Sequence, residues 1–154
     1  MNNIPSVEEL LPHDEPMILI DRVLSIDVDS IRAQVDIGSK NPFYNEETQT
    51  IPAYVGIEFM AQAIAAWSGY HAIAQSEQPP IGFLLGSRRY HTLCDAFSNG
   101  QVIDIYAEQV MESNGMAVFS ADLEHQGVKI ATAQLNVYVP SEQKLQEMKM
   151  RSQA

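Results

Sequence analysis

The stretch IPAYVGIEFMAQAIAAW, residues 51–67, decides the fold of this chain. It predicts a helix that is apolar on nearly every side and that carries one carboxylate, Glu58, near its start. A helix without a polar face has to be covered on all sides. A buried carboxylate is costly unless its pKa rises or a partner satisfies it. We therefore expect Glu58 to lie in an apolar pocket, where a carboxyl group performs acid–base chemistry at neutral pH.

The composition is that of one compact domain spanning residues 1–154, with a polar tail over 141–154. Hydrophobic residues make up 45% of the chain, which is enough for a sizeable core. The single cysteine, Cys94, excludes an internal disulfide framework and is typical of a reducing compartment. The first ten residues show neither a basic region nor an apolar run, so we expect no signal peptide and a cytoplasmic location.

The charge balance excludes two classes of partner. Nine Lys and Arg against twenty Asp and Glu give a formal net charge of −11, whereas nucleic acids and anionic membranes are bound by basic surfaces. A membrane span over 54–74 is also disfavoured, because Glu58, Gln62, Ser68 and His71 interrupt the apolar run. A helix wrapped by the chain's own sheet is the preferred interpretation.

The flanking sequence predicts strands on both sides of this helix. Ser6 and Glu9 form a capping-box pattern for a short first helix, and residues 38–53 are predicted to be an irregular loop. Small side chains at Ala131 and Ala133 would let the central helix lie close to the sheet. Strands are predicted over 17–27, 30–37, 81–91, 101–112, 116–125 and 128–139. The predicted class is α+β, with an antiparallel sheet of five to six strands wrapped around one long helix.

Three motifs resemble the 3-hydroxyacyl-(acyl carrier protein) dehydratases of fatty-acid synthesis, the FabZ-like family. They are LPHDEPMILIDRV at 11–23, Asn41-Pro42-Phe43, and the helix segment 55–63 with Glu58. The resemblance covers about residues 11–91 and implies the hotdog fold. It also implies a dimer that pairs its sheets and places its active sites at the interface. In the family, each site combines a histidine of one subunit with an acidic residue from the other subunit's helix.

Chain length and Tyr90, within GSRRYH at 86–91, make the sequence most similar to one branch of that family. This branch holds the ApeP-type dehydratase subunits of aryl-polyene lipid synthesis.

The sequence departs from the family at the general base. The family's loop carries a Gly-His-Phe-Pro motif, whereas residues 44–50 are about three residues shorter and contain no histidine. Glu58 keeps the family's spacing from Pro52, and Ala53 replaces the family's glycine. The resemblance thus implies that Glu58 protonates the leaving hydroxyl and that the Ala53 N–H polarises the thioester carbonyl at a helix N-terminus.

Two hypotheses supply the missing base. In the first it is His13, from the matched opening block; His91, His71 and His125 are weaker candidates. In the second, the chain donates Glu58 to a heterodimer whose other hotdog subunit provides the histidine. In an isologous homodimer a missing base is missing twice, which favours the second hypothesis.

Other residues have narrower predicted roles. Gln62, one turn after Glu58, either orients the carboxylate or satisfies a buried backbone group. Arg88 and Arg89 form the only adjacent basic pair, a docking patch for an acidic acyl carrier protein. No metal-ligand spacing occurs, and no cofactor is expected beyond the phosphopantetheine that carries the substrate. A hotdog thioesterase and a non-catalytic partner subunit remain the alternative functions.

Overall fold

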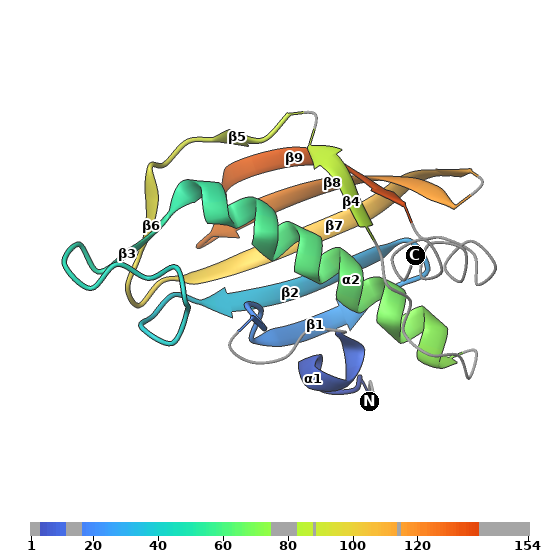
Figure 1. Cartoon of the computed structure of the whole chain (residues 1–154), viewed down its shortest axis with the longest axis horizontal. Coiled ribbons are helices and arrows are strands. Elements are labelled where there is room, and N and C mark those ends of the chain that lie inside the picture. The colour runs from blue at the N-terminus through green and yellow to red at the C-terminus, as the bar shows by residue number, and fades with distance from the viewer. Residues whose placement is uncertain (1–3, 12–16, 75–82, 88, 114, 139–154) are drawn as a thin grey trace, which may run out of the picture.

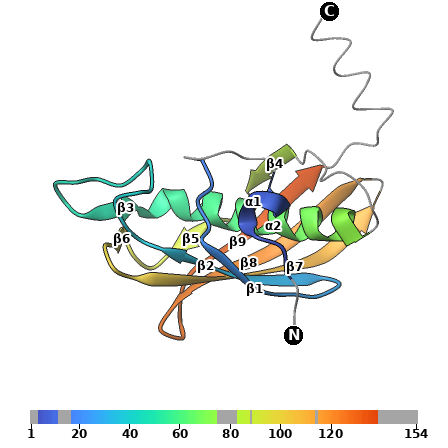
Figure 2. The ribbon, with the colours of Figure 1, turned by 90° about the horizontal axis from the view of Figure 1, so that it is seen from below.

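One long helix lies across one face of an antiparallel sheet. The computed structural model describes residues 4–11, 17–74, 83–87, 89–113 and 115–138. A short 3-10 helix, η1 (Ala53–Val55), leads directly into α2 (Gly56–Ala74), and α2 crosses the sheet diagonally (Figure 1). Seen from below, α2 forms one layer and the curved sheet forms the other (Figure 2). The predicted α+β arrangement around one central helix is confirmed.

Six strands form the path of the main sheet, and all neighbours are antiparallel. A two-residue strand, β5 (His91–Thr92), also pairs with β9. The order places β1 and β4 at the two ends. In that order, the strands are β1 (Arg22–Ile26), β2 (Ser30–Asp36), β7 (Val102–Ser113), β8 (Met116–His125), β9 (Val128–Tyr138) and β4 (Phe83–Ser87).

A second, two-stranded sheet joins the end of the predicted loop 38–53 to a segment more than 40 residues later in the sequence. β3 (Thr50–Pro52) pairs antiparallel with β6 (Ala96–Ser98). Sequence patterns miss both strands, because three residues are too few to show alternation. The first predicted strand is also too long: it begins at Arg22 rather than Met17, since residues 17–20 contact α2 instead.

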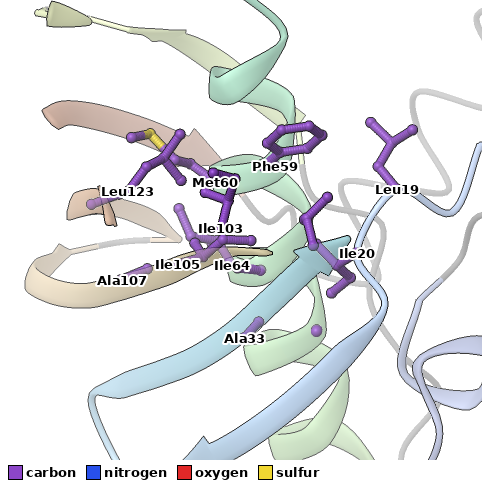
Figure 3. Packing of buried hydrophobic residues seen from close by; sticks show 14 of the residues in the cluster. Leu19, Ile20, Ala33, Phe59, Met60, Ile64, Ile103, Ile105, Ala107 and Leu123 are labelled. Carbon is purple, nitrogen blue, oxygen red and sulfur yellow. The ribbon is translucent and has the colours of Figure 1, made fainter. Parts of the chain in front are cut away.

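The core lies between α2 and the sheet. Met60 and Ile64 of α2 lie toward Ile103, Ile105 and Leu123 of the strands (Figure 3). Phe59 points instead toward Leu19 and Ile20, and all these side chains are buried. The short helix α1 (Val7–Leu10), predicted from Ser6, packs against α2. Gly69 is required at their contact, because a Cβ there would overlap the Leu10 carbonyl. Among the helices of the described residues, none is long and apolar enough to cross a membrane.

Candidate active site

Glu58 lies in the first turn of α2 on the face that points away from the sheet. Its neighbours Phe59 and Met60 are fully buried, whereas Glu58 is exposed and Tyr54, one turn earlier, is 68% exposed. The expectation that Glu58 is buried in an apolar pocket is therefore wrong for this chain alone. The sheet covers only one side of α2, and the outer side carries Tyr54, Glu58 and the half-buried Ala61 and Ala65.

We call this set of four residues, Tyr54, Glu58, Ala61 and Ala65, the outer face of α2. Within the described part of the chain, the Glu58 carboxylate has no hydrogen-bond or ion-pair partner. It is thus an unpaired acid on an otherwise apolar helix face. Such a group is available to a substrate or to a residue that comes from another chain.

In the turn before Glu58, both the N–H and the carbonyl of Ala53 are hydrogen-bonded. The Ala53 N–H donates to the Asp95 carbonyl at 3.0 Å. This bond extends the β3–β6 ladder by one residue, because Pro52 is paired with Ala96. The N–H is therefore engaged in this structure, contrary to the expectation that it is free to polarise a thioester carbonyl.

Tyr90 binds the carbonyl of Ala53. Its hydroxyl donates to the Ala53 carbonyl at 2.5 Å. Burial raises the pKa of Tyr90 to about 12, with a further contribution from Cys94, so the hydroxyl keeps its proton at neutral pH. Sequence reasoning assigns Tyr90 no such contact. The sequence signal for this contact is Gly56, a glycine in the first turn of a buried helix.

Gln62 is 5% exposed and binds backbone rather than Glu58. Its Oε1 accepts the N–H of Leu19 at 2.8 Å and that of Ile20 at 3.4 Å, and its Nε2 donates to the Met17 carbonyl. The hypothesis that Gln62 orients the carboxylate is wrong, and the alternative that it satisfies buried backbone holds. Gln62 thereby ties residues 17–20 to α2.

The loop without histidine is closed by its own hydrogen bonds. Asn45 N–H donates to the Thr50 carbonyl at 2.8 Å. The Asn45 Oδ1 accepts the N–H groups of Glu47 at 2.9 Å and of Thr48 at 3.1 Å. The loop is a compact turn of exposed polar residues, and it offers acids but no base.

None of the three described histidines contacts Glu58. His71 lies thirteen residues further along α2, about 20 Å at the rise of a helix, where its Nε2 lies 3.0 Å from the Asp27 carbonyl. His91 is exposed on β5, and His125 ends β8. His13 falls outside the described residues, so its candidacy as the base stays a prediction.

Of the predicted docking pair, Arg88 lies outside the described residues and Arg89 is exposed next to Tyr90. The other described cations all have partners: Arg22 with Asp36, Lys40 with Asp21, Lys129 with Asp122, and Arg32 over the ring of Tyr106. Within the described residues, Arg89 is the only Lys or Arg for which the structure shows no such partner. No group of three His, Cys, Asp or Glu in the described part could hold a metal ion.

Comparison with known proteins identifies the family of the chain. A sequence model of the ApeP-like family, described as ApeP dehydratase, matches residues 5–149. The chain is 29% identical over 136 residues to a 3-hydroxyacyl-[acyl-carrier-protein] dehydratase FabZ of Streptococcus sanguinis, covering 88% of this chain and 96% of the relative.

Solved structures give the same result. A chain of the dehydratase heterocomplex ApeI:P from Xenorhabdus doucetiae superposes with a TM-score of 0.85 at 30% identity, covering 94% of this chain and 97% of the other. A hypothetical thioesterase of Streptococcus pneumoniae, solved with coenzyme A, has a TM-score of 0.61 at 15% identity over 78% of this chain and 85% of the other. At that identity it shares the fold alone.

Fold and relatives together define the class: this is a hotdog-fold dehydratase, a hydro-lyase. Since the family model spans nearly the whole sequence, the chain belongs to the ApeP-like dehydratase family.

Proposed function

We propose that this chain is the Glu58-donating subunit of a dehydratase that converts 3-hydroxyacyl thioesters of acyl carrier protein into trans-2-enoyl thioesters. One observation carries the proposal: on the otherwise apolar outer face of α2, the Glu58 carboxylate has no partner among the residues that the structure describes. The FabZ relatives and the ApeI:P complex support the choice of reaction.

The elimination needs an acid and a base in one site. The base removes the proton from the α-carbon, and the electron pair forms the new double bond as the C–O bond at the β-carbon breaks. Glu58 gives its proton to the departing hydroxyl, which leaves as water. The base takes up the α-proton and Glu58 ends ionised, so proton exchange with solvent restores both groups.

The base comes from a second hotdog subunit in this proposal. None of the described histidines contacts Glu58, and the loop 44–50 is closed around Asn45. Among the described strands, β4 lies at one end of the sheet order and pairs only with β9, so its other edge could be extended by the sheet of a second subunit. A homodimer would repeat the same missing base in both sites unless His13 provides it.

Arg89 supports a carrier-protein partner. It is an exposed cation in a chain of net charge −11, and it follows Arg88 directly in sequence. It also adjoins Tyr90, whose hydroxyl binds the turn before Glu58. An acidic carrier protein docked there would deliver its phosphopantetheine arm close to the start of α2.

The test uses the complex purified through a tag on this chain, with 3-hydroxyoctanoyl-(acyl carrier protein) as substrate. We expect Glu58→Gln to lower kcat by at least about 100-fold, because a general acid contributes a factor of that order. Glu112→Gln, at an exposed carboxylate near the end of β7, is the matched control and should retain full activity.

Three outcomes separate the alternatives. Unchanged dehydration by Glu58→Gln would assign the chemistry to the partner and make this chain a non-catalytic subunit. Dehydration by the chain alone that His13→Ala abolishes would replace the heterodimer with a homodimer. Hydrolysis of octanoyl thioester that outpaces dehydration would indicate a thioesterase.

A further inference from the structure

The residue that fixes the start of α2 comes from a segment far away in the sequence. Tyr90 lies between β4 and β5 and is separated by 37 positions from Ala53, whose carbonyl accepts its hydroxyl. The backbone of Asp95, in the same segment, accepts the N–H of Ala53. The Ala53 residue is therefore held at both of its backbone polar groups by residues 90–95.

Space for the Tyr90 hydroxyl exists only because residue 56 is glycine. A Cβ built on Gly56 would overlap the Tyr90 hydroxyl and would lie 2.8 Å from the Leu123 side chain. Glycine at a helix position normally lowers helix stability relative to alanine. Here its absent side chain is what lets the hydroxyl reach past the first turn of α2 to Ala53.

The same turn sets the direction of Glu58. Ala53 begins η1, η1 continues into α2 without a break, and Glu58 follows in the first turn of α2. A rotation of the peptide at Ala53 therefore moves the Glu58 carboxylate relative to whatever meets the outer face. A misplacement of about 1 Å is enough to slow a reaction that depends on geometry.

We propose that Tyr90 is a positioning residue of this site: its hydroxyl fixes the Ala53 carbonyl and thereby the orientation of the turn that presents Glu58. The inference rests on the proposed function, in which Glu58 is the acid. Tyr90 does not transfer a proton in this role. It acts through the backbone, and its effect falls on the chemical step rather than on substrate affinity.

The first test is Tyr90→Phe in the complex with its partner subunit, assayed with 3-hydroxyoctanoyl-(acyl carrier protein). We expect kcat to fall about tenfold, the factor that one hydrogen bond of ordinary strength provides, with KM changed less than about twofold. Tyr106→Phe is the matched control. Tyr106 also donates its hydroxyl to one acceptor, Glu108, at 2.7 Å, but it lies on β7 and its loss should leave kcat unchanged.

The second test moves the hydroxyl without removing it. Gly56→Ala introduces the Cβ that collides with Tyr90, so it should also lower kcat. Added to Tyr90→Phe, the same substitution should cost less, because the overlap with the hydroxyl is gone and only the close contact with the end of the Leu123 side chain and with the Phe97 ring remains. This non-additive double-mutant cycle is the signature of a direct coupling between the two positions.

The failures are distinguishable. A Tyr90→Phe complex with kcat within twofold of the unmodified complex, in a system that Glu58→Gln inactivates, would overturn the positioning role alone. A lower melting temperature with unchanged kcat, or a raised KM with unchanged kcat, would overturn it as well. Full activity of Glu58→Gln would overturn the proposed function, and the positioning role with it.

Discussion

The two sides of α2 carry the same kind of residue but meet different surroundings. The side covered by the sheet and by residues 17–20, with Met60 and Phe59, is fully buried within this chain. The outer face, with Tyr54, Ala61 and Ala65, is almost as apolar in composition but remains partly or largely exposed. A helix that is apolar on both sides therefore indicates that each side packs against a different surface. One comes from the chain itself, and in our proposal the other comes from a partner.

The largest expected effect is on the covered side. Phe59→Ala should lower the free energy of unfolding by about 3–5 kcal/mol, since it removes a fully buried aromatic ring and leaves a cavity. Denaturant unfolding measures this. A loss under about 1 kcal/mol would mean that the covered side packs no more tightly than the outer face.

The next effect concerns the hydrogen bonds of Gln62 on α2 to the backbone of residues 17–20. Gln62→Leu should cost about 3 kcal/mol, because it leaves the N–H of Leu19 and the carbonyl of Met17 without partners in a buried place. The same unfolding experiment tests it. Gln62→Glu is the informative companion, since it keeps an acceptor for Leu19 but has no N–H for Met17.

A smaller effect is expected on the outer face, and it should appear only in the assembly. Ala65→Glu should change the unfolding free energy of the chain alone by less than about 0.5 kcal/mol, as is usual for surface positions. It should weaken binding to the partner subunit at least tenfold, about 1.4 kcal/mol, by placing a charge in an apolar contact. Sedimentation of the mixed subunits measures the second quantity. Unchanged association would show that the partner does not cover this face.

The smallest effect is a pH dependence from Tyr90. Burial raises its pKa from 10.0 to about 12, so between these values the unfolded chain loses the proton while the folded chain keeps it. The unfolded state then binds fewer protons, and the unfolding free energy falls as pH rises from 10 to 12. Tyr90→Phe should reduce this slope relative to the unmodified chain, and by more than Tyr106→Phe, because the hydrogen bond to Glu108 raises the pKa of Tyr106 to a smaller extent. Equal slopes in Tyr90→Phe and the unmodified chain would contradict the burial of the Tyr90 hydroxyl.

The parts of the fold that were predictable have local signatures. The central helix and the long strands follow from apolar periodicity, and the turn at Asp27–Ser30 follows from its residue types; there the Asp27 N–H donates to the Ser30 carbonyl at 2.8 Å. β3 and β6 have no such signature, because each is stabilised by the other from about 45 residues away. Pattern reading cannot find a strand whose only support is distant.

The sequence singles out Glu58 as the candidate acid but does not reveal its surroundings. Glu58 is singled out because its segment resembles the dehydratase family and because it is the one carboxylate in the apolar segment 51–67. Its exposure does not follow, because composition cannot separate a helix face covered by its own chain from one covered by another. Gln62 and Tyr90 each act on backbone groups 37 or more positions away, and no local pattern records such partners.

The double anchoring of Ala53 has a consequence for the order of folding. Both of its backbone polar groups depend on residues 90–95, so the first turn of the helix reaches its final geometry only after the chain beyond β4 has docked. Contacts of such sequence separation form late, after local ones. The middle of the helix can therefore form before its first turn. Hydrogen exchange at the Ala53 amide should report this last closure, with protection that appears after that of the Ile64 amide.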